Sequence, residues 1–187
     1  CKENIVVYAA HTNLDNVAGG VNYRLAELIG LQNVRILSPQ KNALLKLVTF
    51  VPEKYAELVR TTLFNSGAGC IGNYDSSSFN LKGEGTFRAG ENCHPFCGEI
   101  GELHIENEVR IETILPAYKM SDVKQALLSA HPYEEPVYDF YPLNNQWAQA
   151  GSGIVGELPE SEEELNFLQR MKELFEVECI KYSTPTG

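Results

Sequence analysis

The order of hydrophobic periodicities between residues 46 and 141 constrains the fold more strongly than any other feature of this 187-residue sequence. Short β-branched runs and alternating patterns predict strands, whereas apolar residues three and four apart predict helices. Gly83 and Gly85 indicate a turn, and Asn107 indicates a turn or a bulge. The predicted elements are a strand at 47–51, a helix at 52–65, strands near 70–79, 86–88 and 103–114, a helix at 121–130 and a strand at 136–141. This is the order of a split βαβ sandwich, so we expect a ferredoxin-like domain here.

The sequence on either side of this region predicts a second unit. Its expected elements are a helix from Gly20 to a stop at Gly30, a strand at 34–37, a helix at 160–175 with Leu165, Leu168, Met171 and Leu174 inward, and a strand at 177–182. Residues 38–42 have the composition of a linker. We therefore expect residues 45–144 to form an inserted domain, while residues 1–44 and 145–187 come together as one incomplete α/β unit. The predicted fold class is α/β and α+β.

The first apolar run, residues 5–10, ends abruptly in His11, Asn13 and Asp15. The run predicts a buried strand, and strands of α/β sheets present ligands at their carboxyl ends. In an extended chain His11 and Asp15 would lie roughly 13 Å apart, so sharing an ion requires a turn. A turn at Asn13 would let the imidazole and the carboxylate converge on one divalent metal. The alternative is a hydrogen-bonded histidine at a strand end and an aspartate that caps a helix.

The wider motif favours the metal interpretation. The sequence YAAHTNLD at 8–15, followed by GGVN at 19–22, closely resembles the signature of the NIF-three-like family. Members of that family are hexamers with a dinuclear metal centre and often carry the name of a type-two GTP cyclohydrolase homologue. The resemblance implies that His11 and Asp15 are metal ligands. The family's remaining ligands are a His-His pair upstream of this motif and a His-x-x-x-Glu near the C-terminus. No His-His pair precedes the motif here, and no His-x-x-x-Glu lies near the end of this sequence.

The same resemblance carries expectations about cofactor and activity. It implies two divalent ions per subunit of the full-length protein, of zinc, iron or manganese, and a dinuclear metal-dependent hydrolase of unknown substrate. The GTP cyclohydrolase name is an inherited label, because no residue here indicates recognition of guanine or triphosphate. The alternative is a regulatory or scaffold protein without catalysis.

Three further motifs resemble the PII-like domain inserted in many bacterial NIF-three-like proteins. They are GAGCIGNY at 67–74, GEGTF at 83–87 and HPYEEP at 131–136. GSGIVGELP at 151–159 is similar to the segment where such chains re-enter the main domain. Because PII and CutA proteins trimerise, the resemblance implies a homo-oligomer, a trimer or a hexamer. It also implies that the insert senses an unknown small molecule or mediates assembly.

Composition excludes several classes of partner. A formal net charge of −10 disfavours nucleic acid, because phosphate contacts need a basic surface. No apolar run approaches the roughly 20 residues of a membrane span. Five cysteines, an odd number, do not form a secreted disulfide framework, so reduced thiols and a cytoplasmic protein are expected. The sequence begins with Cys1 and no leader follows, which predicts an excised fragment and not a secreted precursor.

Two other groups offer metal-binding or catalytic side chains. Cys93, His94 and Cys97, with His104, could hold a zinc ion, but the spacing differs from a paired Cys-x-x-Cys knuckle. We favour a packed loop with free thiols, and oxidation of Cys93 to Cys97 stays open. Residues 131–135 could bind a cation or move protons. The favoured interpretation is structural, with Pro132 ending the helix and His131 favouring the negative end of its dipole.

Overall fold

A computed structural model describes residues 3, 5–147 and 149–183, so Cys1 and residues 184–187 lie outside the described chain. The chain divides into two compact units. The first contains the described residues up to Gln40 and from Trp147 onward, and the second spans Lys41–Gln146. We call the second unit the insert. Within the described chain, no helix is both long and apolar enough to cross a membrane.

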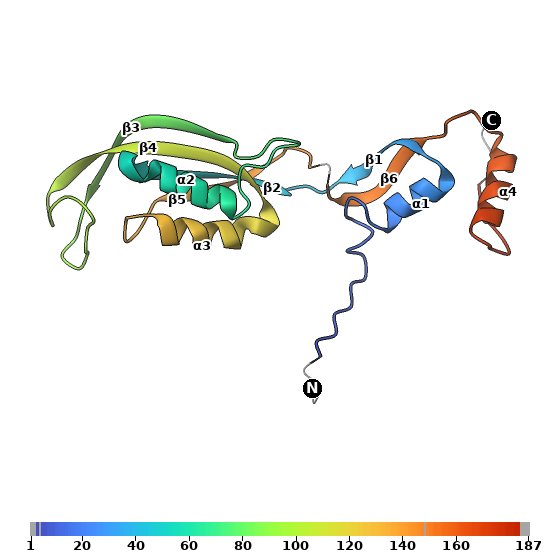
Figure 1. Cartoon of the computed structure of the whole chain (residues 1–187), viewed down its shortest axis with the longest axis horizontal. Coiled ribbons are helices and arrows are strands. Elements are labelled where there is room, and N and C mark those ends of the chain that lie inside the picture. The colour runs from blue at the N-terminus through green and yellow to red at the C-terminus, as the bar shows by residue number, and fades with distance from the viewer. Residues whose placement is uncertain (1–2, 4, 148, 184–187) are drawn as a thin grey trace. The chain divides into compact units, whose positions relative to one another are not determined.

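The insert is a four-stranded antiparallel sheet with two helices (Figure 1). Its elements are β2 (Leu44–Pro52), the 3-10 turn η1 (Glu53–Tyr55), α2 (Ala56–Asn65), β3 (Ser78–Arg88), β4 (Leu103–Pro116), the 3-10 turn η2 (Ala117–Lys119), α3 (Met120–Ala130) and β5 (Tyr138–Leu143). The strand order is β3-β4-β2-β5, so both crossovers skip a strand. This order confirms the predicted ferredoxin-like fold class.

The core of the insert lies between the sheet and both helices, which lie side by side (Figure 1). Helix α2 contributes Val59 and Leu63, which are four residues apart and therefore share one face. Helix α3 contributes Val123 and Leu127 at the same spacing. Opposite them lie apolar side chains from β2 and β4, namely Leu45, Leu47, Val51, Val109, Ile111 and Leu115. The apolar residues that recur at helical spacing in the sequence are thus the ones that α2 and α3 bury against the sheet.

Strands β3 and β4 form a long continuous ribbon, which corrects two sequence expectations. Neither the turn expected at Gly83 and Gly85 nor the turn or bulge at Asn107 is present. Gly83 pairs with Glu108, and Gly85 pairs with Glu106, in an unbroken register. A Cβ on Gly85 would lie 2.1 Å from a carboxylate oxygen of Glu108. The glycine therefore makes room for a neighbouring side chain and does not reverse the chain.

The first unit contains a two-stranded sheet and two helices (Figure 1). Its elements are α1 (Val21–Ile29), β1 (Gln32–Pro39), β6 (Gly151–Glu157) and α4 (Glu164–Leu174). Gly30 ends α1 in the left-handed conformation, φ 85°, as its position predicted. In α4 Met171 is buried as expected, whereas Leu165 and Leu174 are exposed and not inward.

Two predicted strands of this unit do not form. Residues 5–10 have no regular structure, and their side chains are exposed, Val6 by 92%. Residues 177–182 also lack strand structure. A strand needs a neighbour to satisfy its backbone hydrogen bonds, and no described residue pairs with either segment. An apolar pattern alone was therefore not enough to predict a strand in these two segments.

Candidate functional site

The first candidate site is the turn that carries His11 and Asp15. The backbone N–H of Asp15 donates to the Thr12 carbonyl at 3.2 Å, which closes the turn. Asn22 of α1 donates from Nδ2 to the Asp15 carbonyl at 2.7 Å and so holds this turn against the helix. A Cβ on Gly20 would lie 1.9 Å from the Leu14 carbonyl oxygen, so the backbone path requires glycine there.

Both predicted ligands have available side chains. His11 is exposed and Asp15 is half-buried, and neither side chain has a hydrogen bond or ion pair to any other described residue. An imidazole nitrogen and a carboxylate oxygen suit zinc, iron or manganese. No third histidine, cysteine or carboxylate of the described chain joins them in one cluster. The two residues therefore fit a divalent metal as part of a ligand set, and their role stays a prediction.

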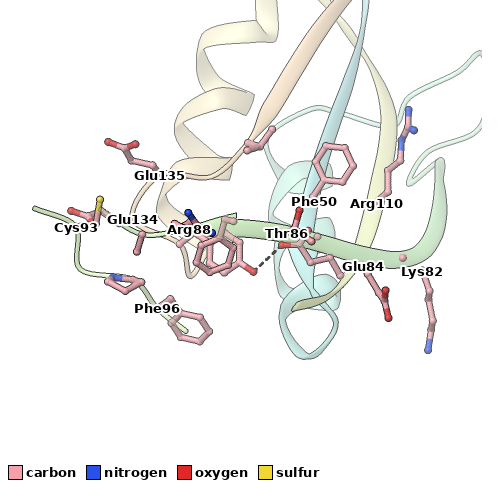
Figure 2. Close-up of a pocket in the computed structure, with 18 of the residues that line it drawn as sticks. Phe50, Lys82, Glu84, Thr86, Arg88, Cys93, Phe96, Arg110, Glu134 and Glu135 are labelled. Carbon is pink, nitrogen blue, oxygen red and sulfur yellow. Dashed lines mark hydrogen bonds between the residues drawn. The ribbon is translucent and has the colours of Figure 1, made fainter. Parts of the chain in front are cut away.

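The second candidate site is a cavity of about 550 Å³ in the insert. Its walls come from β3, the loop after β3, β4 and the segment between α3 and β5. Figure 2 shows Lys82, Glu84 and Arg110 towards one end and Phe96 and Glu134 towards the other. Aromatic rings and charges of both signs thus surround a volume suited to a small molecule.

His131 connects this cavity to the core. Its Nε2 lies 2.9 Å from the Phe50 carbonyl oxygen, and its Nδ1 accepts the Tyr133 backbone N–H at 3.1 Å. Since a carbonyl only accepts, Nε2 carries the hydrogen and the ring is neutral. Burial lowers the pKa of His131, against a smaller effect of the Phe50 hydrogen bond. His131 lies at the end of α3, as predicted. Because its ring is neutral, the expected interaction of a charged histidine with the helix dipole does not occur.

Tyr133 forms part of the cavity wall. Its hydroxyl donates to Glu108 Oε1 at 2.8 Å, and its ring lies 6.0 Å from Phe87 and 6.1 Å from Phe96, between centroids. Burial, followed by the carboxylate of Glu108, raises the pKa of the phenol. Tyr133 therefore remains a neutral hydrogen-bond donor at physiological pH.

We expect the free energy of unfolding of the insert to decrease as pH falls below 6.5, the ordinary pKa of a histidine. The unfolded chain takes up a proton at His131 there, whereas the folded insert, with its lowered pKa, does not. The stability is fully present above that pH. Urea denaturation between about pH 5 and pH 7.5 checks this. The carboxyls of Glu106 and Glu112 have an ordinary pKa of 4.5 that is lowered further in the folded chain, so both are largely ionised in the folded and the unfolded state over that range. A His131→Gln variant with the same pH slope would contradict it.

A third group gathers Cys97, His104 and Glu106. One ligand atom from each lies within 4.8 Å of the others. His104 Nε2 lies 3.0 Å from Glu106 Oε2, and this hydrogen bond lowers the pKa of Glu106. Burial, and then Glu106, raise the pKa of the Cys97 thiol.

This group differs from the cluster that the sequence suggested. Cys93 and His94 do not join it, and Cys93 is an exposed free thiol at the cavity. All four cysteines of the described residues are free, as expected. Glu106 and Glu108 were not among the site residues predicted from the sequence. Their alternation with His104 on a predicted strand was the available signal, because residues two apart share a face.

Fold and sites together place the chain in a class: a mixed α/β protein of two compact units, one of them ferredoxin-like, with side chains of metal-binding type in both. The chain belongs to the Duf34/NIF3 (NGG1p interacting factor 3) family, whose model matches residues 1–186. The resemblance inferred from the motifs is thereby confirmed.

Individual relatives agree with this assignment. A protein of Halalkalibacterium halodurans named GTP cyclohydrolase 1 type 2 homolog is 44% identical over 177 residues, which cover 94% of this chain and 48% of that protein. The Bacillus subtilis protein of the same name is 46% identical over 158 residues, 84% of this chain and 42% of that protein. A crystal structure of a Bacillus cereus protein related to NIF3 aligns at 44% identity with a TM-score of 0.77, over 95% of this chain and 47% of that one. The chain thus spans about half the length of the curated relatives it matches.

Proposed function

We propose that this chain is part of a metal-dependent hydrolase in which His11 and Asp15 are ligands of a dinuclear centre. The observation that carries the proposal is the pair of unpartnered side chains on a turn held by Asn22, within the motif that resembles the family signature. Because the chain covers about half of its relatives, the proposal concerns the whole protein. The substrate stays open, and the relatives' name supports hydrolysis only as a class.

The residues present would supply part of each coordination sphere. Two divalent ions would lower the pKa of bound water and stabilise the negative charge that develops in a hydrolysis. His11 and Asp15 would contribute one nitrogen and one carboxylate towards them, from one turn. Two ligands leave most positions to solvent, so we expect the 187-residue chain alone to bind metal weakly at this turn.

We expect His11→Ala and Asp15→Asn each to weaken metal binding by the whole protein at least about tenfold and so to lower its metal content, since loss even of a side chain that only supports a ligand costs about 10–100-fold in affinity. The first change removes the nitrogen, and the second removes the charge while keeping the shape. Inductively coupled plasma mass spectrometry of the purified protein measures the content, and circular dichroism checks the fold. His94→Ala, an exposed histidine of the insert, is the matched control. Wild-type metal content in both variants would overturn the assignment.

The cavity of the insert favours a second function, in which a small molecule binds there and the whole protein is a regulatory or scaffold protein without catalysis. Hydrolysis of a substrate panel by the whole protein, with and without divalent metal, separates the two functions, because a scaffold shows no metal-dependent turnover.

Assembly into a homo-oligomer is part of both proposals. Strands β3 and β5 are the edges of the insert sheet, and open edges can pair with another chain. A trimer or hexamer in light scattering would agree, whereas a monomer at every concentration would contradict assembly.

A further inference from the structure

We propose that Cys97, His104 and Glu106 form a zinc site in the insert, separate from His11 and Asp15. The proposal does not depend on the hydrolase function.

Strand β4 and the preceding loop position the donors. His104 and Glu106 are two residues apart on β4, so their side chains share one face of the ribbon. Cys97 comes from the loop between β3 and β4, whose ends are joined by a hydrogen bond from the Gly101 N–H to the Ala89 carbonyl at 2.9 Å. The three ligand atoms lie within 4.8 Å of one another. Small rotations of these side chains would give the ligand separations of a tetrahedral ion, which are about 3.3–3.7 Å for bonds of about 2.0–2.3 Å.

Gly98 allows the loop to approach the imidazole. Its φ is +77°, and a Cβ there would lie 2.8 Å from His104 Cβ and 3.2 Å from Nδ1. The next residue back is Cys97, so the close approach of this backbone places the thiol beside the histidine. Phe87, which pairs with His104 across the β3–β4 ribbon, also packs against the ring, with centroids 5.2 Å apart. The imidazole is therefore held between the strand ribbon and the loop.

The donor types match zinc. A thiolate, an imidazole and a carboxylate are ligands of this ion, and three protein ligands leave a fourth position for water or another small ligand. His104 and Glu106 each expose 28% of their side chains, and Cys97 is half-buried, so solvent reaches the cluster. The donors are thus partly shielded and still accessible to an ion.

The local charges also favour a cation. The negative charges of Glu106 and Glu108 both interact electrostatically with the Cys97 thiol. The positive charge of Lys54 interacts with Glu106. A thiolate and a carboxylate together would balance the two charges of Zn²⁺. On binding, the thiol releases its proton to solvent. His104 would coordinate through Nε2 after its hydrogen moves to Nδ1, in place of the hydrogen bond to Glu106.

The test uses the 187-residue chain carrying His11→Ala and Asp15→Asn, stripped of metal by a chelator. Isothermal titration with Zn²⁺ should show one equivalent bound with a Kd of about 1 μM or tighter. Co²⁺ should produce the near-ultraviolet charge-transfer band of a thiolate ligand. In this background a failure of the hydrolase proposal neither creates nor removes the signal.

Variants then assign the ligands. We expect Cys97→Ser and His104→Gln each to weaken Zn²⁺ binding at least about tenfold and Cys97→Ser to abolish the Co²⁺ band. Cys93→Ser and His94→Gln, in the same loop, are matched controls and should bind as the parent does. Unchanged affinity in Cys97→Ser, an equal loss in Cys93→Ser or absence of Zn²⁺ binding by the parent would each overturn the site.

A Gly98→Ala variant tests the positioning of the donors. It keeps all three ligands but adds a Cβ against His104 at a positive φ. We expect weaker Zn²⁺ binding with the Co²⁺ band still present at saturating metal. Gly90→Ala, where a Cβ has open space, should bind Zn²⁺ as the parent does. Parent-like affinity in Gly98→Ala would contradict the inferred role of the loop.

Discussion

Replacing Leu63 by alanine should lower the free energy of unfolding of the insert by about 2–5 kcal/mol. Leu63 is fully buried in the cluster between α2, α3 and the sheet. Its truncation removes apolar contacts and leaves a cavity that the close-packed surroundings only partly fill. The same helix offers a matched control, because Leu58 is 55% exposed. Leu58→Ala should change the stability by less than about 0.5 kcal/mol.

Urea denaturation of the chain, followed by circular dichroism, measures both variants. Hydrogen exchange of the β4 amides assigns the loss to the insert, since β4 lies in the middle of its sheet. Equal destabilisation by the two variants would contradict the core that we describe. An unchanged midpoint for Leu63→Ala would do the same.

Replacing the buried His131 by alanine should cost the insert about 2–5 kcal/mol, because it leaves a cavity and removes the partner of two partly buried backbone groups. The last pair of β2 with β5 is Thr49 with Tyr138, and the Phe50 carbonyl beyond it bonds to His131 Nε2. The imidazole thus takes the place of a strand partner there. The Tyr133 N–H, which bonds to Nδ1, loses its acceptor as well.

Urea denaturation at a pH near 7.5, where the histidine is neutral, measures this loss without a contribution from titration. His94→Ala is the control, since His94 is exposed and its ring has no protein partner in the described chain. The Tyr133 amide loses its hydrogen-bond acceptor in His131→Ala, and Tyr133 lines the cavity, so hydrogen exchange at this amide should also accelerate. A loss no larger than that of the control would show that the two hydrogen bonds contribute little.

Much of the insert fold could be predicted from local patterns. The helical spacing of Val59 with Leu63 and of Val123 with Leu127 predicts both helices and their buried faces. The alternation along β4 predicts a strand. The exceptions are glycines: Gly83 and Gly85 indicate a turn by composition, yet both lie in an unbroken ladder. Their neighbours across the ribbon decide this, and those neighbours are more than twenty residues away in the chain.

In the first unit, local patterns predicted a strand that does not form. Residues 5–10 have the composition of a buried strand but remain exposed, because a strand forms only beside another strand and the described chain supplies none there. The motif at His11 and Asp15 was nevertheless recognisable, since it depends on residue types and spacing within a few positions. The structure adds the turn and the free side chains.

The family, the strand-and-helix order of the insert and the donor types available for a metal all follow from the sequence alone. The sequence could not determine which donors meet. The group that the sequence suggested was Cys93, His94 and Cys97 with His104, although its spacing favoured free thiols, and Glu106 was only one of the polar residues of an alternating strand. The tertiary structure selected Cys97, His104 and Glu106, because the strand pleat places 104 and 106 on one face and the close approach of Gly98 brings Cys97 over that face. Such a contact joins a loop to a strand, so no local pattern records it.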